Sequence, residues 1–133
     1  MTERGRLSRT IEVLVYASVV LGAGFLAQVY NLLPSFVFYS LTVGWIAYIV
    51  AAICDARRMR VAHPLVLVLA VLTLAVSLPQ PEHYTLLNPS QVLAGTTFLL
   101  GSAFQVCLII LIPVHYLRRR AESRSVPAVT SAD

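Results

Sequence analysis

The chain has 133 residues, of which 58% are apolar and only 12% are charged, and its formal net charge is +4 at pH 7. A soluble domain usually carries about 25% charged residues, so the composition argues against a water-facing domain, and the length allows one compact unit. The basic residues are all Arg and form three clusters beside apolar runs. This distribution argues against a nucleic-acid module, which gathers basic and aromatic side chains on one polar face.

The first two apolar runs follow a basic N-terminal segment, residues 1–10, that is expected to be cytoplasmic. They cover residues 11–33 and 35–54, and the second contains no charged residue. A helix rises about 1.5 Å per residue, so twenty residues cover the roughly 30 Å hydrocarbon layer of a bilayer. The sequence therefore predicts a transmembrane helix over each run.

The third and fourth runs predict two more transmembrane helices, over residues 62–78 and 90–117. The third is the shortest and must either recruit residues 61–64 or thin the bilayer locally to span it. Pro113 is expected to bend the fourth helix or to loosen its last turns. The tail, residues 118–133, lacks periodicity and is expected to be disordered and cytoplasmic. The expected fold is an all-α integral membrane protein, an up-down-up-down bundle of four transmembrane helices over residues 11–117.

The Arg clusters predict how the chain is threaded. Four spans place both termini and the loop at 55–63 on one side, and all ten Arg residues lie on that side. Cytoplasmic loops are enriched in Arg and Lys, so the sequence predicts a multi-pass protein of the cell membrane with both termini in the cytoplasm. The residues expected to determine this topology are Arg4, Arg6, Arg9, Arg57, Arg58, Arg60, Arg118, Arg119 and Arg120.

Each predicted helix carries small or polar residues at spacings of three and four, which places them on one face. Small side chains let membrane helices approach closely, and polar ones form hydrogen bonds between helices. On the second helix, bulky residues such as Trp45 are expected on the opposite face. The residues predicted to pack helices together are Gly24, Gln28, Ser40, Gly44, Ala47, Ala51, Thr73, Ser77, Ala94, Gly101 and Gln105.

Gln105 is the most polar residue deep within the fourth run, and we expect it to face protein. An unpaired amide in hydrocarbon costs several kcal/mol. Two residues at matching depth are candidate partners: Ser18 on the first helix and Tyr48 on the second.

Two histidines, His63 and His115, are predicted near the cytoplasmic ends of adjacent helices. Such a pair could ligate a haem, although an ordinary interfacial role is favoured. Cys54 and Cys107 have no metal-ligand spacing and are expected to be small packing residues. Because the sequence contains no nucleophile–base pair, phosphate loop or metal-ligand motif, no enzymatic activity, cofactor or metal is expected.

The sequence leaves three functional hypotheses open. The first is a non-catalytic accessory or structural subunit of a larger membrane complex. The second is a small parallel homo-oligomeric channel or carrier for a neutral or lipophilic solute, and the third is a redox anchor that binds haem through His63 and His115. The expected partners are the lipid bilayer and either other membrane-protein subunits or a second copy, and no nucleic acid is expected.

Overall fold

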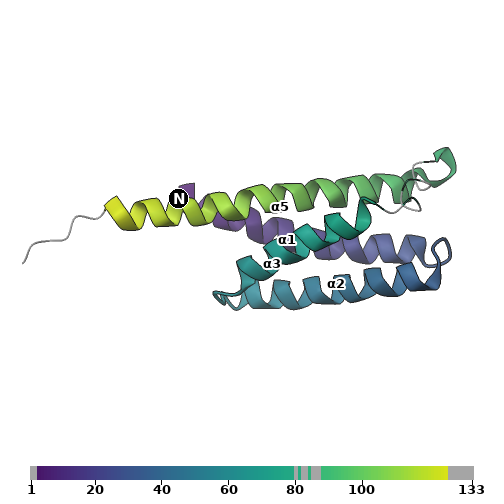
Figure 1. Cartoon of the computed structure of the whole chain (residues 1–133), viewed down its shortest axis with the longest axis horizontal. Helices are drawn as coiled ribbons and strands as arrows, with labels where there is room; N and C mark the ends of the chain where they lie inside the picture. Colours follow the sequence, from purple (N-terminus) through teal and green to yellow (C-terminus); the bar gives the residue numbers. More distant parts are fainter. Residues whose placement is uncertain (1–2, 80, 82–83, 85–87, 126–133) are drawn as a thin grey trace, which may run out of the picture.

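The computed structural model describes residues 3–79, 81, 84 and 88–125. These residues contain four α-helices and one short 3₁₀ helix (Figure 1). No strand occurs within those ranges, so the prediction of an all-helical chain is confirmed there. The helices are α1 (Glu3–Val29), α2 (Ser35–Ala56), α3 (Ala62–Ser77) and α5 (Val92–Ser125), with the 3₁₀ helix η1 (Pro89–Gln91) before α5.

The four helices contact one another in a ring. α1 contacts α2 and α5, and α3 contacts the same two helices. Short connections, residues 30–34 and 57–61, make successive helices antiparallel neighbours. Figure 1 shows α1, α2 and α5 running lengthwise side by side, whereas the shorter α3 crosses the bundle obliquely.

The helix boundaries differ from the predicted ones most at the two ends of the chain. α1 begins at Glu3 and ends at Val29, whose carbonyl accepts hydrogen bonds from the N–H groups of Leu32 and Leu33. α5 continues through Pro113 to Ser125, so residues 118–125 are helical and not disordered as predicted. Residues 126–133 of the predicted tail lie outside the described residues. The helices therefore extend into polar sequence that the apolar pattern does not mark.

Three helices are long and apolar enough to cross a membrane: Gly5–Val29, Ser35–Ala56 and Pro89–Arg124. Their most apolar windows have mean hydropathies of 1.9, 2.0 and 2.2. α3 has 16 residues, which corresponds to a length of about 24 Å, less than the roughly 30 Å hydrocarbon core. The crossing of a membrane by α3 therefore remains a prediction.

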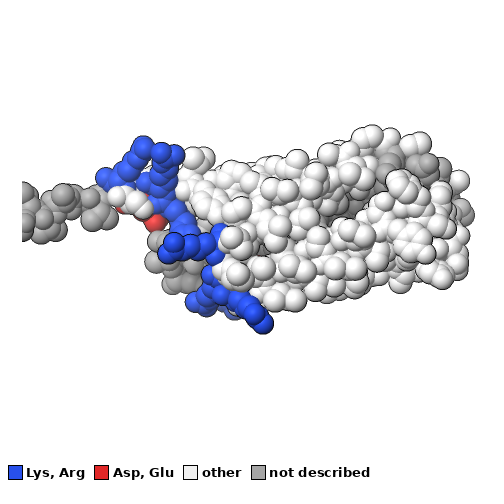
Figure 2. Space-filling view, turned by 60° about the horizontal axis from the view of Figure 1, so that its bottom comes forward, with Lys and Arg blue, Asp and Glu red and all other residues white. Residues whose placement is uncertain are grey.

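The described Arg side chains gather at one end of the bundle, which we call the arginine end (Figure 2). The main core runs from the middle of the bundle toward this end. It contains Ile11, Val15, Tyr48, Ala51, Ala52, Val66, Ala70, Leu108 and Ile112. A smaller cluster, Val29 and Ala94 with Phe25 and Leu33 against them, closes the opposite end between α1 and α5. Packing is therefore dense in one half of the molecule and sparse in the other.

Candidate functional site

A cavity of about 410 Å³ lies in the half of the bundle opposite the arginine end, and all four helices line it. Its volume lies within the range of small-molecule binding sites. Figure 2 shows a hollow in the uncharged surface at this end of the molecule. The cavity is therefore a candidate site for a small molecule.

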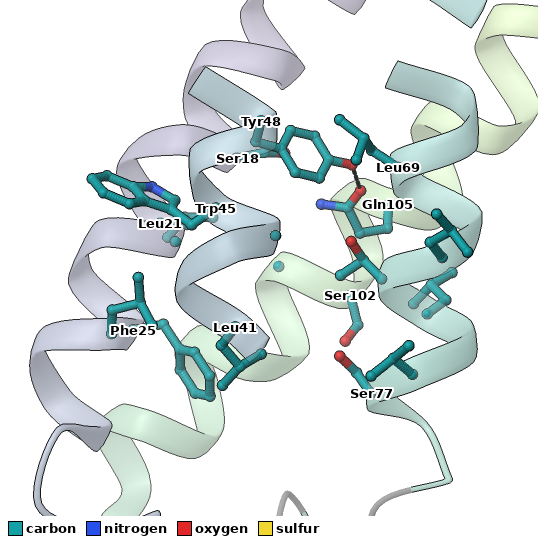
Figure 3. Close-up of a pocket in the computed structure, with 18 of the residues that line it drawn as sticks. Ser18, Leu21, Phe25, Leu41, Trp45, Tyr48, Leu69, Ser77, Ser102 and Gln105 are labelled. Carbon is teal, nitrogen blue, oxygen red and sulfur yellow. Dashed lines mark hydrogen bonds between the residues drawn. The ribbon is translucent and has the colours of Figure 1, made fainter. Parts of the chain in front are cut away.

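The mouth of the cavity lies between α2 and α3. The lining residues that are exposed are Ser40 and Val43 on α2 and Leu72 and Val76 on α3, whereas those on α1 and α5 are buried or half-buried. In Figure 3, α2 and α3 stand on either side of the opening and α5 crosses behind it. Access is thus from the side of the bundle.

Two glycines contribute to the open space. A Cβ atom added at Gly44 or at Gly101 would meet no atom within 4 Å, and both residues line the cavity. The sequence predicts that these glycines allow close helix approach, but in the structure they face the cavity. Toward the arginine end the space is closed by core residues such as Val15, Ala70 and Leu108.

Tyr48 and Gln105 form a hydrogen bond at the inner end of the cavity. The Tyr48 hydroxyl donates to Oε1 of Gln105, which is only 6% exposed. Of the two partners that the sequence leaves open, the structure selects Tyr48. Figure 3 shows the amide nitrogen of Gln105 turned away from Tyr48 into the open space. Because Oε1 is occupied by the tyrosine, the amide presents a donor to the cavity.

Ser18 is the second polar group at this depth. It lines the cavity, is 8% exposed, and its hydroxyl has no hydrogen-bond partner among the described residues. Six other helical hydroxyls among the described residues donate to the carbonyl four residues earlier, those of Thr10, Ser40, Thr42, Thr96, Thr97 and Ser123. A buried polar group without a partner costs about 1–3 kcal/mol, and because the Ser18 oxygen is covered by surrounding atoms, the cavity does not supply that partner in this conformation.

Trp45 forms an aromatic wall of the cavity and joins α2 to α1. Its indole Nε1 donates to the Val19 carbonyl oxygen at 2.8 Å. A Cβ atom added at Gly22 would lie 2.6 Å from Cδ1 of Trp45, so the indole packs directly on that glycine. The prediction that Trp45 lies opposite the packing face is therefore wrong. Sequence reasoning also missed Gly22, although a bulky residue on one helix facing a glycine on the next is the signal that would have revealed it.

The predicted packing residues divide into three groups by burial. Ala51, Ser77, Ala94 and Gln105 are buried, whereas Gln28, Gly44, Ala47, Thr73 and Gly101 are half-buried. Gly24 and Ser40 are exposed and face outward or toward the mouth. Gln28 does join two helices, because its Nε2 lies 3.4 Å from Oγ1 of Thr97 while also donating to the Gly24 carbonyl.

The two histidines stack on each other. The ring centroids of His63 and His115 are 5.4 Å apart, with an interplanar angle of 15°. His115 is 5% exposed, and Nε2 of His63 is buried without a hydrogen-bond partner among the described residues. Two axial haem ligands must point at one iron from opposite faces of the macrocycle, and stacked rings do not point in this way. Within the described ranges no group of three or more His, Cys, Asp and Glu residues could hold a metal.

The predicted topology-determining residues whose side chains are described lie at the arginine end (Figure 2). The last turns of α5, residues 118–125, continue beyond the end of the α2–α3 connection (Figure 1). We call this segment the basic arm, because it contains four Arg residues and Glu122, all of them exposed.

Comparisons with known proteins find no match: no family model, curated protein or solved structure is significantly similar to this chain.

Proposed function

We propose that this protein is a multi-pass integral membrane protein of the cell membrane, with four transmembrane helices and both termini in the cytoplasm. Three long apolar helices support insertion. The gathering of Arg at one end supports the orientation, because cytoplasmic segments are enriched in basic residues. α3 is the shortest span, and its tilt across the bundle gives it no additional reach, so the bilayer is expected to thin beside it.

We further propose that the protein acts as a non-catalytic accessory subunit of a larger membrane complex. The observation that carries this proposal is the basic arm, a helical extension of α5 whose Arg side chains are all exposed. In the proposed orientation it projects beyond the membrane surface, and it offers a partner an ordered array of guanidinium groups for bidentate contacts with carboxylates.

The dense half of the bundle argues against a channel that runs through one copy of the chain. Ile11, Val15, Leu108 and Ile112 are at most 1% exposed, and they fill the space between the cavity and the arginine end. A single copy therefore offers no continuous path along its axis through the described residues.

The test is recovery of partners from native membranes in a mild detergent, with three versions of the full chain. The first is unchanged, the second carries Arg119→Gln, Arg120→Gln and Arg124→Gln, and the third carries Arg57→Gln, Arg58→Gln and Arg60→Gln as a charge-matched control. We expect a stoichiometric membrane-protein partner with the first and third versions, and at least tenfold less of it with the second. Recovery of the unchanged chain without any stoichiometric partner would contradict the proposal.

A carrier for a neutral or lipophilic solute is the second candidate, and the cavity is the observation that favours it. Transport would require the core at the arginine end to separate so that the cavity opened on that side as well. Uptake into vesicles containing only this protein would favour the carrier over the accessory subunit.

A further inference from the structure

We propose that the cavity is a binding site for an uncharged, lipid-soluble carbonyl compound of the quinone type. Its planar ring would lie at the inner end, near Ser18 and Gln105, and its apolar tail would extend toward the mouth between α2 and α3. This inference goes beyond the accessory role and does not depend on it; only the route of entry rests on the proposed membrane placement.

The lining indicates that the ligand is uncharged. No Asp, Glu, Lys, Arg or His is among the residues that line the cavity, and most of the lining is aliphatic or aromatic. Placing a charge in such a site without a partner would be strongly unfavourable. A neutral molecule with a large apolar surface gains from burial there instead.

The polar groups at the inner end indicate a hydrogen-bond acceptor on the ligand. The Tyr48 hydroxyl occupies Oε1 of Gln105, which fixes the amide so that its N–H groups face the cavity. The Ser18 hydroxyl beside the cavity also lacks a partner among the described residues, but its oxygen is covered by surrounding atoms, so the Gln105 amide is the donor that the cavity presents. A carbonyl oxygen accepts hydrogen bonds and donates none, so it is the group that this donor matches.

The aromatic side chains indicate that the acceptor belongs to a planar ring. Phe25, Trp45, Tyr48 and Phe98 all line the cavity. Tyr48 stands at the inner end beside Gln105 (Figure 3), whereas the rings of Phe25 and Phe98, 6.3 Å apart between centroids, line the part of the cavity that the tail would occupy. Aromatic rings favour offset-stacked and edge-to-face contacts with other rings, which a saturated acyl chain cannot make.

The mouth indicates entry from the hydrocarbon layer. Val43 lies eight residues after the start of α2 at Ser35, which places it about 12 Å along the helix axis. With α2 across the membrane, this position lies among the lipid chains. A lipid-soluble ligand would therefore enter sideways without passing through water.

The single Trp of the chain provides a direct test, because Trp45 lines the cavity and quinones quench tryptophan fluorescence. The full-length protein in detergent is titrated with decylubiquinone. We expect saturable quenching with one site per chain. Quenching that rises linearly with quinone concentration, without saturation, would show only collisions in the micelle and would overturn the proposal.

Matched glycine variants show whether binding occurs in this cavity. Gly101→Leu fills the cavity from α5, where an added Cβ meets nothing within 4 Å, and Gly24→Leu makes the same change at an exposed position that is equally open. We expect the saturable quenching to be lost in Gly101→Leu and kept in Gly24→Leu, with unchanged helix content in both. Equal quenching of both folded variants would overturn the proposal.

Two further measurements test the carbonyl. Gln105→Leu should weaken binding about fivefold, the effect of one lost hydrogen bond. Decane, which has no acceptor, should reverse the quenching by decylubiquinone at least tenfold less well than a saturated ketone of the same chain length, which has a carbonyl but no quinone ring. If decane competes equally, the site is a non-specific apolar hollow and the proposal fails. Because these measurements are made in detergent, they remain informative even if the proposed topology is wrong.

Discussion

Gln105 shows how one polar residue is accommodated in the middle of an apolar helix. It is buried against α2, where the Tyr48 hydroxyl satisfies its carbonyl oxygen. Hydrogen bonds between membrane helices contribute about 0.6 kcal/mol on average, with a maximum near 1.7 kcal/mol. The pair therefore adds little net stability, and its main consequence is to fix which way the amide points.

A double-mutant cycle would measure this pair. We expect Gln105→Leu and Tyr48→Phe each to lower the free energy of unfolding by roughly 0.5–1.5 kcal/mol. The double variant should cost less than the sum, because each single change already breaks the same hydrogen bond. Denaturant unfolding in mixed detergent micelles, followed by circular dichroism, gives the four values.

The control for this cycle is Thr96→Val. Thr96 is exposed on α5 and its hydroxyl donates to the Val92 carbonyl of its own helix. This variant should change the free energy of unfolding by less than 0.5 kcal/mol, as is usual at surface positions. Strictly additive costs in the double variant would show that Tyr48 and Gln105 do not interact.

The sequence was informative about Gln105 because depth in an apolar run and the cost of an unpaired amide both follow from residue types alone. It narrowed the partner to two residues at matching depth, of which the structure selects Tyr48. It could not reveal that the Ser18 hydroxyl lacks a partner. That property depends on side-chain rotamers and on how far α2 and α3 stand apart, and neither is encoded in a local pattern.

At the scale of helices, the contact between α1 and α2 depends on Gly22. The indole of Trp45 occupies the space where a side chain at this position would lie, and it also donates to the Val19 carbonyl. Gly24, two residues further along, has open space around it. The two glycines therefore have opposite roles in the same helix.

We expect Gly22→Ala to destabilise the bundle by about 1–3 kcal/mol, the usual cost of overpacking. Gly24→Ala should be neutral or should stabilise by up to about 1 kcal/mol, because alanine loses less backbone entropy in a helix than glycine. Thermal unfolding of the two variants in the same detergent gives the comparison. Trp45 emission should shift in Gly22→Ala alone, and equal stabilities would contradict the assigned role of Gly22.

The predicted helix ends show where a hydropathy pattern stops being informative. The apolar runs located the central parts of α1, α2 and α5, because burial in protein or lipid requires apolar side chains. The pattern missed the first turns of α1, where Leu7 is the one residue that packs on the core, and the basic arm of α5, where polar residues predominate. Arg, Ala and Glu favour helix formation intrinsically, so a polar helix continues there without an apolar face to mark it.

At the scale of the whole molecule, the proposed orientation follows from the arginine end. Single cysteines at Ser90, before α5, and at Ser125, at its end, test it in a background with Cys54→Ala and Cys107→Ala. In intact cells we expect a membrane-impermeant thiol reagent to label the Ser90→Cys variant and to leave the Ser125→Cys variant unlabelled. The expected ratio is at least tenfold, because one position faces the medium and the other the cytoplasm.

Permeabilised cells provide the control, since both variants should then be labelled equally. Labelling of the Ser125→Cys variant from outside intact cells would contradict the proposed orientation. If neither variant were labelled in intact cells, the 79–91 connection would lie on the same side of the membrane as the C-terminus. That outcome would contradict four membrane crossings.

The uneven packing of the bundle also bears on its mechanical properties. Pressure favours states of smaller total volume, and its effect on a folded protein scales with the internal void. The half of the bundle opposite the arginine end contains the cavity of about 410 Å³, whereas the half at the arginine end is filled by side chains. Compression would therefore act mainly by moving α3 toward α2. The half of the bundle that contains the cavity is expected to be more compressible than the half at the arginine end.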